Sequence, residues 1–340
     1  MKIYRHFIPE NVSPRNTKKI GIYNAKGERL FGVMPGNLAL KKTGEKIYSF
    51  GALSDVHIGV STALSDFKSA LSYLSDMTDF ICISGDLIHG SPTDLTLEEQ
   101  IAKYIECIEN YATKPVYACA GNHDGYYVDN IETVIESYTG HPLYYSFTQG
   151  SDVFIFVGNR SDTTGSLFTV EELQWLYEVL EENRNKRCFV FQHVRPDDAC
   201  GNALGIYTHD IWGGTEQIVF ESLLQHYSNV VFFHGHSHLK YDLQQHSEVA
   251  NIDKKFGCWS VHIPSITVPR GTDSVVNPSR VELYAESEGY IIDVYENGIH
   301  LRGRDFIKGE FLPIASYWLD TTLQPVEANT YVDSTGTIKT

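Results

Sequence analysis

Five short polar strings follow apolar, strand-like runs in this chain, and they constrain its fold more than any other feature. In order, they are Asp55-Val56-His57, Gly85-Asp86, Gly121-Asn122-His123-Asp124, His193 and Gly235-His236-Ser237-His238. Each preceding run reads as a β-strand, so each string stands where a strand ends and a loop begins. Ligand sites of α/β sheets form at the carboxyl ends of strands, so the five strings are expected to meet there.

The apolar runs alternate with helical patterns along most of the chain. Helical periodicity covers residues 61–76, 95–111, 169–183 and 214–227. Strands that alternate with helices predict an α/β fold, and turn signals at Gln149-Gly150-Ser151 and Asn297-Gly298 add antiparallel strands. We therefore expect two mixed β-sheets packed as a sandwich flanked by helices, with a dinuclear metal site at the strand carboxyl ends.

Three segments are predicted from these patterns. Residues 1–47 contain two alternating runs around Asn24-Ala25-Lys26-Gly27, which predict an N-terminal β-hairpin extension. Residues 48–305 carry all five polar strings and form the main domain. Residues 306–340 have no clear period, so we expect a C-terminal extension laid over the surface.

Composition limits the partners and the compartment. A formal net charge of −16 argues against binding of nucleic acid, which needs a clustered excess of Lys and Arg. No segment approaches the roughly 18 apolar residues of a membrane span, and the N-terminal residues lack the apolar run of a signal peptide. Six cysteines without CxxC spacing are read as reduced thiols. We expect a cytoplasmic protein with no membrane partner.

The polar strings offer the ligands of a hard or borderline divalent cation. They contain carboxylates, an amide oxygen and imidazoles, and they contain no thiolate. Mn²⁺, Fe²⁺ and Zn²⁺ fit such a set. The number of oxygen and nitrogen ligands is enough for two ions, which is typical of a dinuclear metal hydrolase.

The order and spelling of the strings resemble the calcineurin-like metallophosphoesterase superfamily. Its pattern is DxH, GD, GNHD or GNHE, a lone His and GHxH, and the resemblance covers roughly residues 48 to 305. The resemblance implies a first metal ion held by Asp55, His57, Asp86 and His238. It implies a second ion held by Asp86, Asn122, His193 and His236, which makes Asp86 the bridging carboxylate. Such a pair lowers the pKa of a bridging water, and the resulting hydroxide attacks phosphorus.

The resemblance also implies which residues act on the substrate. The His that matches His123 faces the substrate and stabilises phosphoryl charge or protonates the leaving oxygen, and Asp124 would orient it. Arg160, Arg195 and Tyr126 follow strand ends of the same face and are potential substrate contacts. His89, three residues after Asp86, is read as a structural residue.

Within the superfamily, the chain is most similar to the bacterial cyclic-nucleotide phosphodiesterase-like group. The similarity lies in the strings DVH, GDL, GNHD, QHVRP and GHSH. The expected function is hydrolysis of a small phosphate ester, either a phosphodiester or a phosphomonoester. Two alternatives stay open: a metal-stabilised binding or scaffold module without catalysis, and a nuclease of the same superfamily. The sequence leaves the substrate, the native metals and the oligomeric state open.

Overall fold

The structure is a computed structural model of the chain. It describes residues 22–23, 29–31, 45–160, 167–196, 200–201, 215–242, 251–254, 256–272, 280–323, 331–332 and 338–339.

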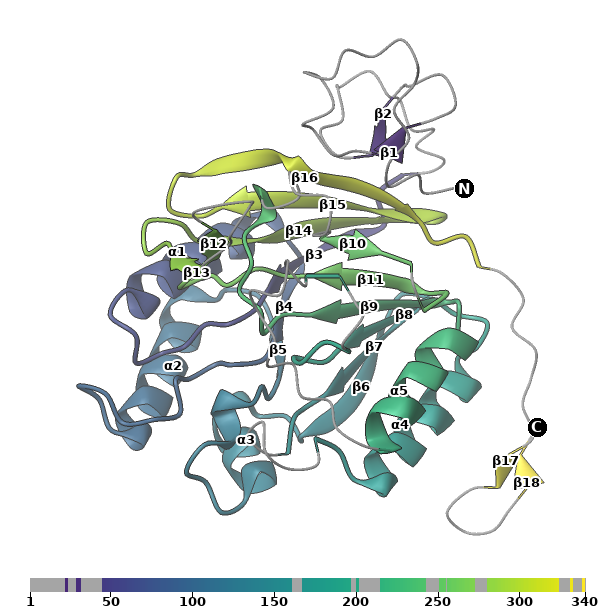
Figure 1. Cartoon of the computed structure of the whole chain (residues 1–340), viewed down its shortest axis with the longest axis horizontal. Coiled ribbons are helices and arrows are strands. Elements are labelled where there is room, and N and C mark those ends of the chain that lie inside the picture. Colours follow the sequence, from purple (N-terminus) through teal and green to yellow (C-terminus); the bar gives the residue numbers. More distant parts are fainter. Residues whose placement is uncertain are drawn as a thin grey trace.

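Two six-stranded sheets make up the body of the protein (Figure 1). The first sheet has the order β16-β15-β14-β3-β4-β5; its strands are β3 (Tyr48–Leu53), β4 (Phe80–Ser84), β5 (Val116–Cys119), β14 (Glu288–Tyr295), β15 (Gly298–Asp305) and β16 (Glu310–Asp320). The second has the order β10-β11-β9-β8-β7-β6; its strands are β6 (Tyr144–Gln149), β7 (Asp152–Val157), β8 (Cys188–Phe191), β9 (Val230–His234), β10 (Ile252–Asp253) and β11 (Trp259–His262).

Each sheet combines parallel and antiparallel strands. In the first sheet β3, β4 and β5 run parallel, whereas β14, β15 and β16 are antiparallel. In the second, β7, β8, β9 and β11 run parallel, and β6 and β10 close the two edges in antiparallel pairing. The parallel strands are near-continuous apolar runs because both of their faces are covered.

The two sheets pack face to face through an aromatic core. The ring of Phe50 on β3 lies 5.2 Å from Phe154 on β7, 5.4 Å from Phe189 on β8 and 6.1 Å from Phe233 on β9, measured between centroids. All four side chains are fully buried. Aromatic pairs at such distances in tilted or edge-on geometry stabilise a core beyond their area alone.

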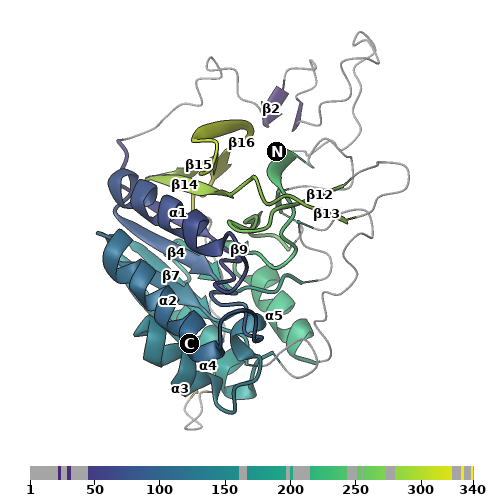
Figure 2. The same cartoon turned by 90° about the vertical axis from the view of Figure 1, so that its left-hand side faces the viewer.

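Helices cover the outer faces of both sheets. The first sheet packs on α1 (Ala63–Met77), α2 (Leu97–Tyr111) and α3 (Ile131–Thr139), and α1 and α2 lie side by side in Figure 2. The second packs on α4 (Val170–Glu182) and α5 (Thr215–His226). Thr169 and Glu172 form a capping box at the start of α4. The predicted sandwich of two mixed sheets flanked by helices is thus confirmed.

Two parts of the chain differ from the sequence-based expectation. The stretch after residue 306 is not a surface tail throughout, because Glu310–Asp320 forms β16 and pairs with β15. The strand lacks a clear period and contains Pro313, which an edge strand tolerates. The nine-residue helix α3 was also not expected.

At the N-terminus, Ile22–Tyr23 (β1) and Arg29–Phe31 (β2) pair antiparallel where the hairpin was predicted. Its role as a separate extension, and the boundary at residue 47, stay predictions, because most of residues 1–44 lie outside the described part. A short pair at the other end joins β17 (Tyr331–Val332) to β18 (Ile338–Lys339). Two further strands, β12 (Arg270–Thr272) and β13 (Arg280–Glu282), form a small ribbon. Each helix of the described residues is too short or too polar to cross a bilayer.

Candidate metal centre

The loops after β3, β4, β5, β8 and β9 carry the polar strings and converge at one edge of the sandwich. Their backbone is unusual: among the described residues other than glycine, only six have a positive φ. These are Asp55 (56°), His57 (49°), Asp86 (52°), Tyr127 (56°), His236 (69°) and His238 (60°). A left-handed conformation costs such residues of order 1–3 kcal/mol and persists where the surrounding structure enforces it. Five of the six belong to the predicted ligand set, so the strain is concentrated at this site.

Glycines in the strings let the loops approach closely. A Cβ at Gly121 would collide with the main-chain nitrogen and side-chain Oδ1 of Asp86, and one at Gly235 would collide with the Ser54 hydroxyl. Main-chain hydrogen bonds then join the loops. The Asp86 carboxylate accepts from the His123 N–H at 2.8 Å, and the Asp55 carboxylate accepts from the His236 N–H at 3.1 Å. The ligand side chains are therefore held by the fold itself.

Four buried side chains form a first group of potential ligands. One ligand atom of each of Asp55, His57, Asp86 and His238 lies within 4.8 Å of those of the other three. His238 Nε2 lies 2.9 Å from Asp55 Oδ1, and His57 Nε2 lies 3.0 Å from His238 Nε2 and 3.5 Å from Asp86 Oδ2. These are the residues expected around the first metal ion.

A second group shares one carboxylate with the first. Asp86, His193 and His236 also have ligand atoms within 4.8 Å of one another, and His193 Nε2 lies 3.0 Å from Asp86 Oδ2. Asn122 follows the end of β5 by three residues, and its buried Oδ1 has no hydrogen-bond partner in the described part of the chain. Asp86 is the side chain common to both groups.

Main-chain carbonyls fix the tautomer of two of these histidines. His193 Nδ1 donates to the Ser84 carbonyl at 2.6 Å, and His238 Nδ1 donates to the Val268 carbonyl at 3.1 Å. In both residues Nε2 is then the nitrogen that faces the carboxylates. Histidine ligands of metal ions are oriented by hydrogen bonds of this kind.

The charges of the site favour a cation. Burial lowers the pKa of His57 to about 4 and also lowers the pKa values of His236 and His238, so these rings are neutral at pH 7. Burial also disfavours a charge on His193, but Asp86 and Asp55 outweigh it and raise its pKa to about 9. Two buried carboxylates therefore face one imidazolium. Divalent cations suit this site, because it combines a net negative charge with unprotonated imidazole nitrogens and the Asn122 amide oxygen. Binding of such a cation would displace the proton of His193.

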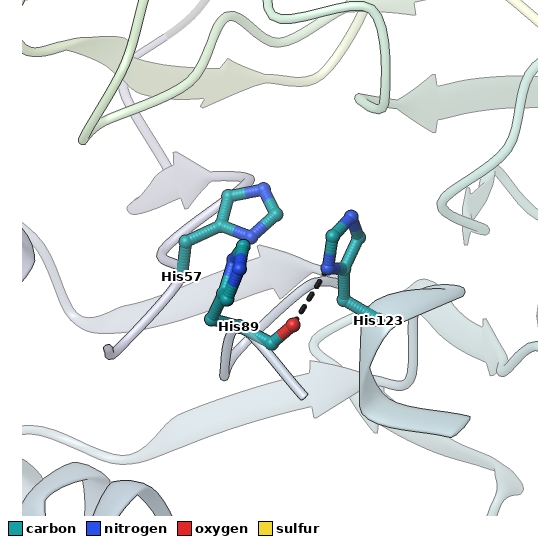
Figure 3. Close-up of side chains that lie close together, drawn as sticks. All are labelled: His57, His89 and His123. Atoms are coloured by element: carbon teal, nitrogen blue, oxygen red, sulfur yellow. Dashed lines mark hydrogen bonds between the residues drawn. The ribbon is translucent and has the colours of Figure 1, made fainter. Parts of the chain in front are cut away.

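His123 lies at the rim of this cluster, in a 3₁₀ turn (His123–Gly125) after β5. Its Nδ1 donates to the His89 carbonyl at 2.7 Å (Figure 3), so Nε2 is not engaged in this bond. Its ring centroid is 4.6 Å from that of His57 and 4.6 Å from that of Tyr126. Tyr126 thus lies beside His123, with its hydroxyl 3.4 Å from Asn122 Nδ2.

The prediction that Asp124 orients His123 is wrong. The Asp124 carboxylate is fully buried and accepts hydrogen bonds from the main-chain N–H groups of Leu87, Ile88 and Gly121 and from the Tyr138 hydroxyl. Neighbouring residues of a helical turn point in different directions, so Asp124 faces inward while His123 faces the site. Asp124 instead ties the loop after β4 to the loop after β5.

Both arginines are engaged in hydrogen bonds. Arg160 Nε donates to Glu172 at 2.8 Å, and a second guanidinium nitrogen pairs with Glu132, so two carboxylates neutralise it. Arg195 is 1% exposed and donates to the Pro196 carbonyl at 3.0 Å. The expectation that these side chains contact substrate is not supported. Residues 197–199 and 202–214, in the loop that follows Arg195, lie outside the described residues.

One residue at the site was read as structural from sequence. His89 lies beside His57 and His123, with ring centroids 5.9 and 5.3 Å away. Burial, and then the neighbouring imidazoles, lower its pKa to about 4. Its position three residues after the shared Asp86 was the only signal in the sequence.

Comparisons with known proteins agree with this geometry. The model of the family described as calcineurin-like phosphoesterase matches residues 48–240. None of the curated proteins matches the chain.

Two solved structures have a similar fold. One is a purple acid phosphatase from yellow lupin seeds, with a TM-score of 0.52 and 16% identity, covering 80% of this chain and 53% of the lupin chain. This chain thus spans about half the length of that enzyme. The other is GAP50 of Plasmodium, with a TM-score of 0.51 and 13% identity, covering 84% of this chain and 91% of that one.

At these identities the likeness shows a shared fold alone. The match to the family model shows more than the fold, because it covers more than half of the 340 residues and includes all five polar strings. The chain belongs to the calcineurin-like phosphoesterase family.

Proposed function

We propose that this protein is a metal-dependent phosphohydrolase that cleaves a small phosphate ester, either a phosphodiester or a phosphomonoester. The observation that carries the proposal is the pair of buried ligand groups that share Asp86 and have a net negative charge. A buried carboxylate pair without a cation is costly, and a divalent cation in each group offsets that cost.

The ligand assignment follows the two groups. Asp55, His57, Asp86 and His238 would hold one ion, and Asp86, Asn122, His193 and His236 would hold the other. The mixture of carboxylate, amide and imidazole ligands suits Mn²⁺, Fe²⁺ or Zn²⁺. When bound, two such ions would supply Lewis-acid activation of a phosphoryl group and of water.

His123 is the residue proposed to move a proton. Because Nδ1 is engaged with the His89 carbonyl, Nε2 would give a proton to the leaving oxygen or donate to a phosphoryl oxygen. Tyr126 packs on the His123 ring and would line the substrate position. Asp124 contributes by holding the two loops that carry Asp86 and Asn122.

Two features of the sequence bear on the class of substrate. The similarity of the strings to the bacterial cyclic-nucleotide phosphodiesterase-like group favours a small phosphodiester, and the net charge of −16 argues against a nucleic-acid substrate. All six cysteines are buried and free, which supports a reducing compartment such as the cytoplasm.

Turnover of bis(p-nitrophenyl) phosphate and p-nitrophenyl phosphate by the full chain with Mn²⁺, Fe²⁺ or Zn²⁺ tests the proposal. We expect hydrolysis that is abolished by Asp86→Ala or His193→Ala. Asp76→Ala and His141→Ala serve as matched controls, since both residues lie outside the ligand groups and should leave turnover intact. Absence of hydrolysis of both esters with every one of these metals would refute an esterase.

A second candidate function is a metal-stabilised scaffold without catalysis. Its support is the fold shared with GAP50, which is described as an anchor in the inner membrane complex of Plasmodium. A scaffold would bind metal tightly and show no turnover in the same assay. The complete ligand set and the engaged Nδ1 of His123 favour the enzyme.

A further inference from the structure

Three imidazoles form a cluster beside the first ligand group. His57, His89 and His123 follow the neighbouring parallel strands β3, β4 and β5, and one ring nitrogen of each lies within 4.8 Å of those of the others. Figure 3 shows the three rings facing a common space. The His57 and His123 rings meet edge to face at 4.6 Å, and the His89 and His123 rings are tilted by 34° at 5.3 Å.

The cluster has nitrogens that no other group uses. His57 Nδ1 and His89 Nδ1 are both buried and lack a hydrogen-bond partner among the described residues. The His57 side chain is only 4% exposed, so water has little access to Nδ1 and does not supply the missing hydrogen bond. Burial of a polar atom without a partner is unfavourable, because its hydrogen bond to water is lost. His123 adds Nε2, because its Nδ1 is engaged with the His89 carbonyl.

The chemistry of this cluster differs from that of the two ligand groups. It offers three nitrogens and no carboxylate, and such a set prefers Zn²⁺ over Mn²⁺ or Mg²⁺. The Asp86-sharing groups combine carboxylates with imidazoles and accept Mn²⁺ as well. The two kinds of site should therefore be distinguishable by the metal supplied.

His57 is common to the cluster and to the first ligand group. Its Nε2 faces His238 and Asp86, at 3.0 and 3.5 Å, which leaves Nδ1 for the cluster. An imidazole binds a cation through each nitrogen once the Nδ1 proton has left to solvent. One residue can thus serve both sites.

We propose that His57, His89 and His123 bind a third divalent cation of the zinc type, and that this cation inhibits hydrolysis. Inhibition follows because the third cation takes Nε2 of His123, the nitrogen assigned to proton transfer. This second half rests on the proposed function, whereas the binding site itself does not. The protein would be activated by metal at low concentration and inhibited by Zn²⁺ at higher concentration.

The first test counts bound metal and needs no activity. The full chain, its His89→Ala and His89→Gln variants and a His141→Ala control are dialysed against a series of Zn²⁺ concentrations, and bound zinc is measured by mass spectrometry. We expect three zinc ions per chain for the wild type and for His141→Ala, and two for both His89 variants. His89→Ala keeps the main-chain carbonyl that accepts from His123, and His89→Gln keeps most of the side-chain volume. Equal zinc stoichiometry in the wild type and the His89 variants would overturn the site.

The second test measures inhibition. Each protein is loaded with Mn²⁺, and hydrolysis of bis(p-nitrophenyl) phosphate is followed as Zn²⁺ is added, relative to the zinc-free rate of the same protein. The zinc concentration for half inhibition should rise by about 10- to 100-fold in the His89 variants, a range typical of weakened metal sites. An unchanged value would refute the inhibitory role. A wild type without any turnover would refute the proposed function, while the zinc count would still decide the third site.

Discussion

Replacing Asp124 with Asn tests whether this buried carboxylate holds the loops after β4 and β5 together. Its Oδ1 accepts from Leu87 N at 3.1 Å, Ile88 N at 3.2 Å and the Tyr138 hydroxyl at 2.9 Å, while Oδ2 accepts from Gly121 N at 2.7 Å. In Asp124→Asn one oxygen remains, and the amide NH₂ takes the place of the other. The Gly121 N–H would then face a donor and lose its partner.

The expected loss of stability is large. A buried N–H without a partner costs about 1–3 kcal/mol, and three further bonds change from charge-assisted to neutral, at about 1 kcal/mol each. We expect the free energy of unfolding to fall by about 4–6 kcal/mol. Tyr138→Phe removes a single donor from the same carboxylate and should cost about 1–2 kcal/mol.

Urea unfolding in EDTA at pH 8 measures both variants without metal. The pH matters because burial, and then the Asp86 charge, raise the pKa of Asp124 to about 6, so the carboxylate is ionised at pH 8. If Asp124→Asn loses no more stability than Tyr138→Phe, the carboxylate does not tie the loops. Loss of turnover in Asp124→Asn at unchanged stability and metal content would instead restore an orienting role for Asp124.

Three other perturbations have defined outcomes. Phe50→Ala, at the centre of the inter-sheet core, should lower the free energy of unfolding by about 3–5 kcal/mol in a urea titration. Leu323→Ala, at an exposed position, is the control and should change it by less than about 1 kcal/mol. Gly121→Ala should abolish Mn²⁺ binding in equilibrium dialysis, because its Cβ would displace Asp86; tight binding would contradict the close approach. Burial raises the pKa of Glu288 to about 8 from an ordinary 4.5. Between these two pH values the folded protein keeps a proton that the unfolded chain has lost. The stability of the wild type therefore falls as the pH rises from 4.5 to about 8. Glu288→Gln, which stays neutral, should therefore exceed the wild type in stability by about 4 kcal/mol at pH 8 and equal it near pH 4. A gap that does not vary with pH would contradict this.

The sequence predicts the sandwich and the ligand cluster because both depend on local patterns. Apolar runs that end in short polar strings mark the parallel strands, and the carboxyl ends of such strands lie at one edge of a sheet. The polar strings alone therefore predict that seven potential metal ligands, distributed from Asp55 to His238, lie close together. The glycines that allow the loops to approach are part of the same strings.

Other features depend on contacts that the sequence does not display. The tautomers of His193, His238 and His123 are set by main-chain carbonyls of Ser84, Val268 and His89, which have no signature in residue type. Asp124 follows His123 directly, yet the turn directs the two side chains to different partners. The strand β16 was missed because an edge strand needs no strict alternation and accepts a proline.

The shared role of Asp86 is the central feature of the site, and the number of Mn²⁺ ions per chain tests it most directly. In equilibrium dialysis, the wild type should bind two ions. His238→Ala and His193→Ala should each keep one, because each removes a ligand from a single group, and Asp86→Asn should keep none at the same Mn²⁺ concentration. Two ions in Asp86→Asn, or the loss of both in His238→Ala and His193→Ala alike, would contradict two sites joined by one carboxylate.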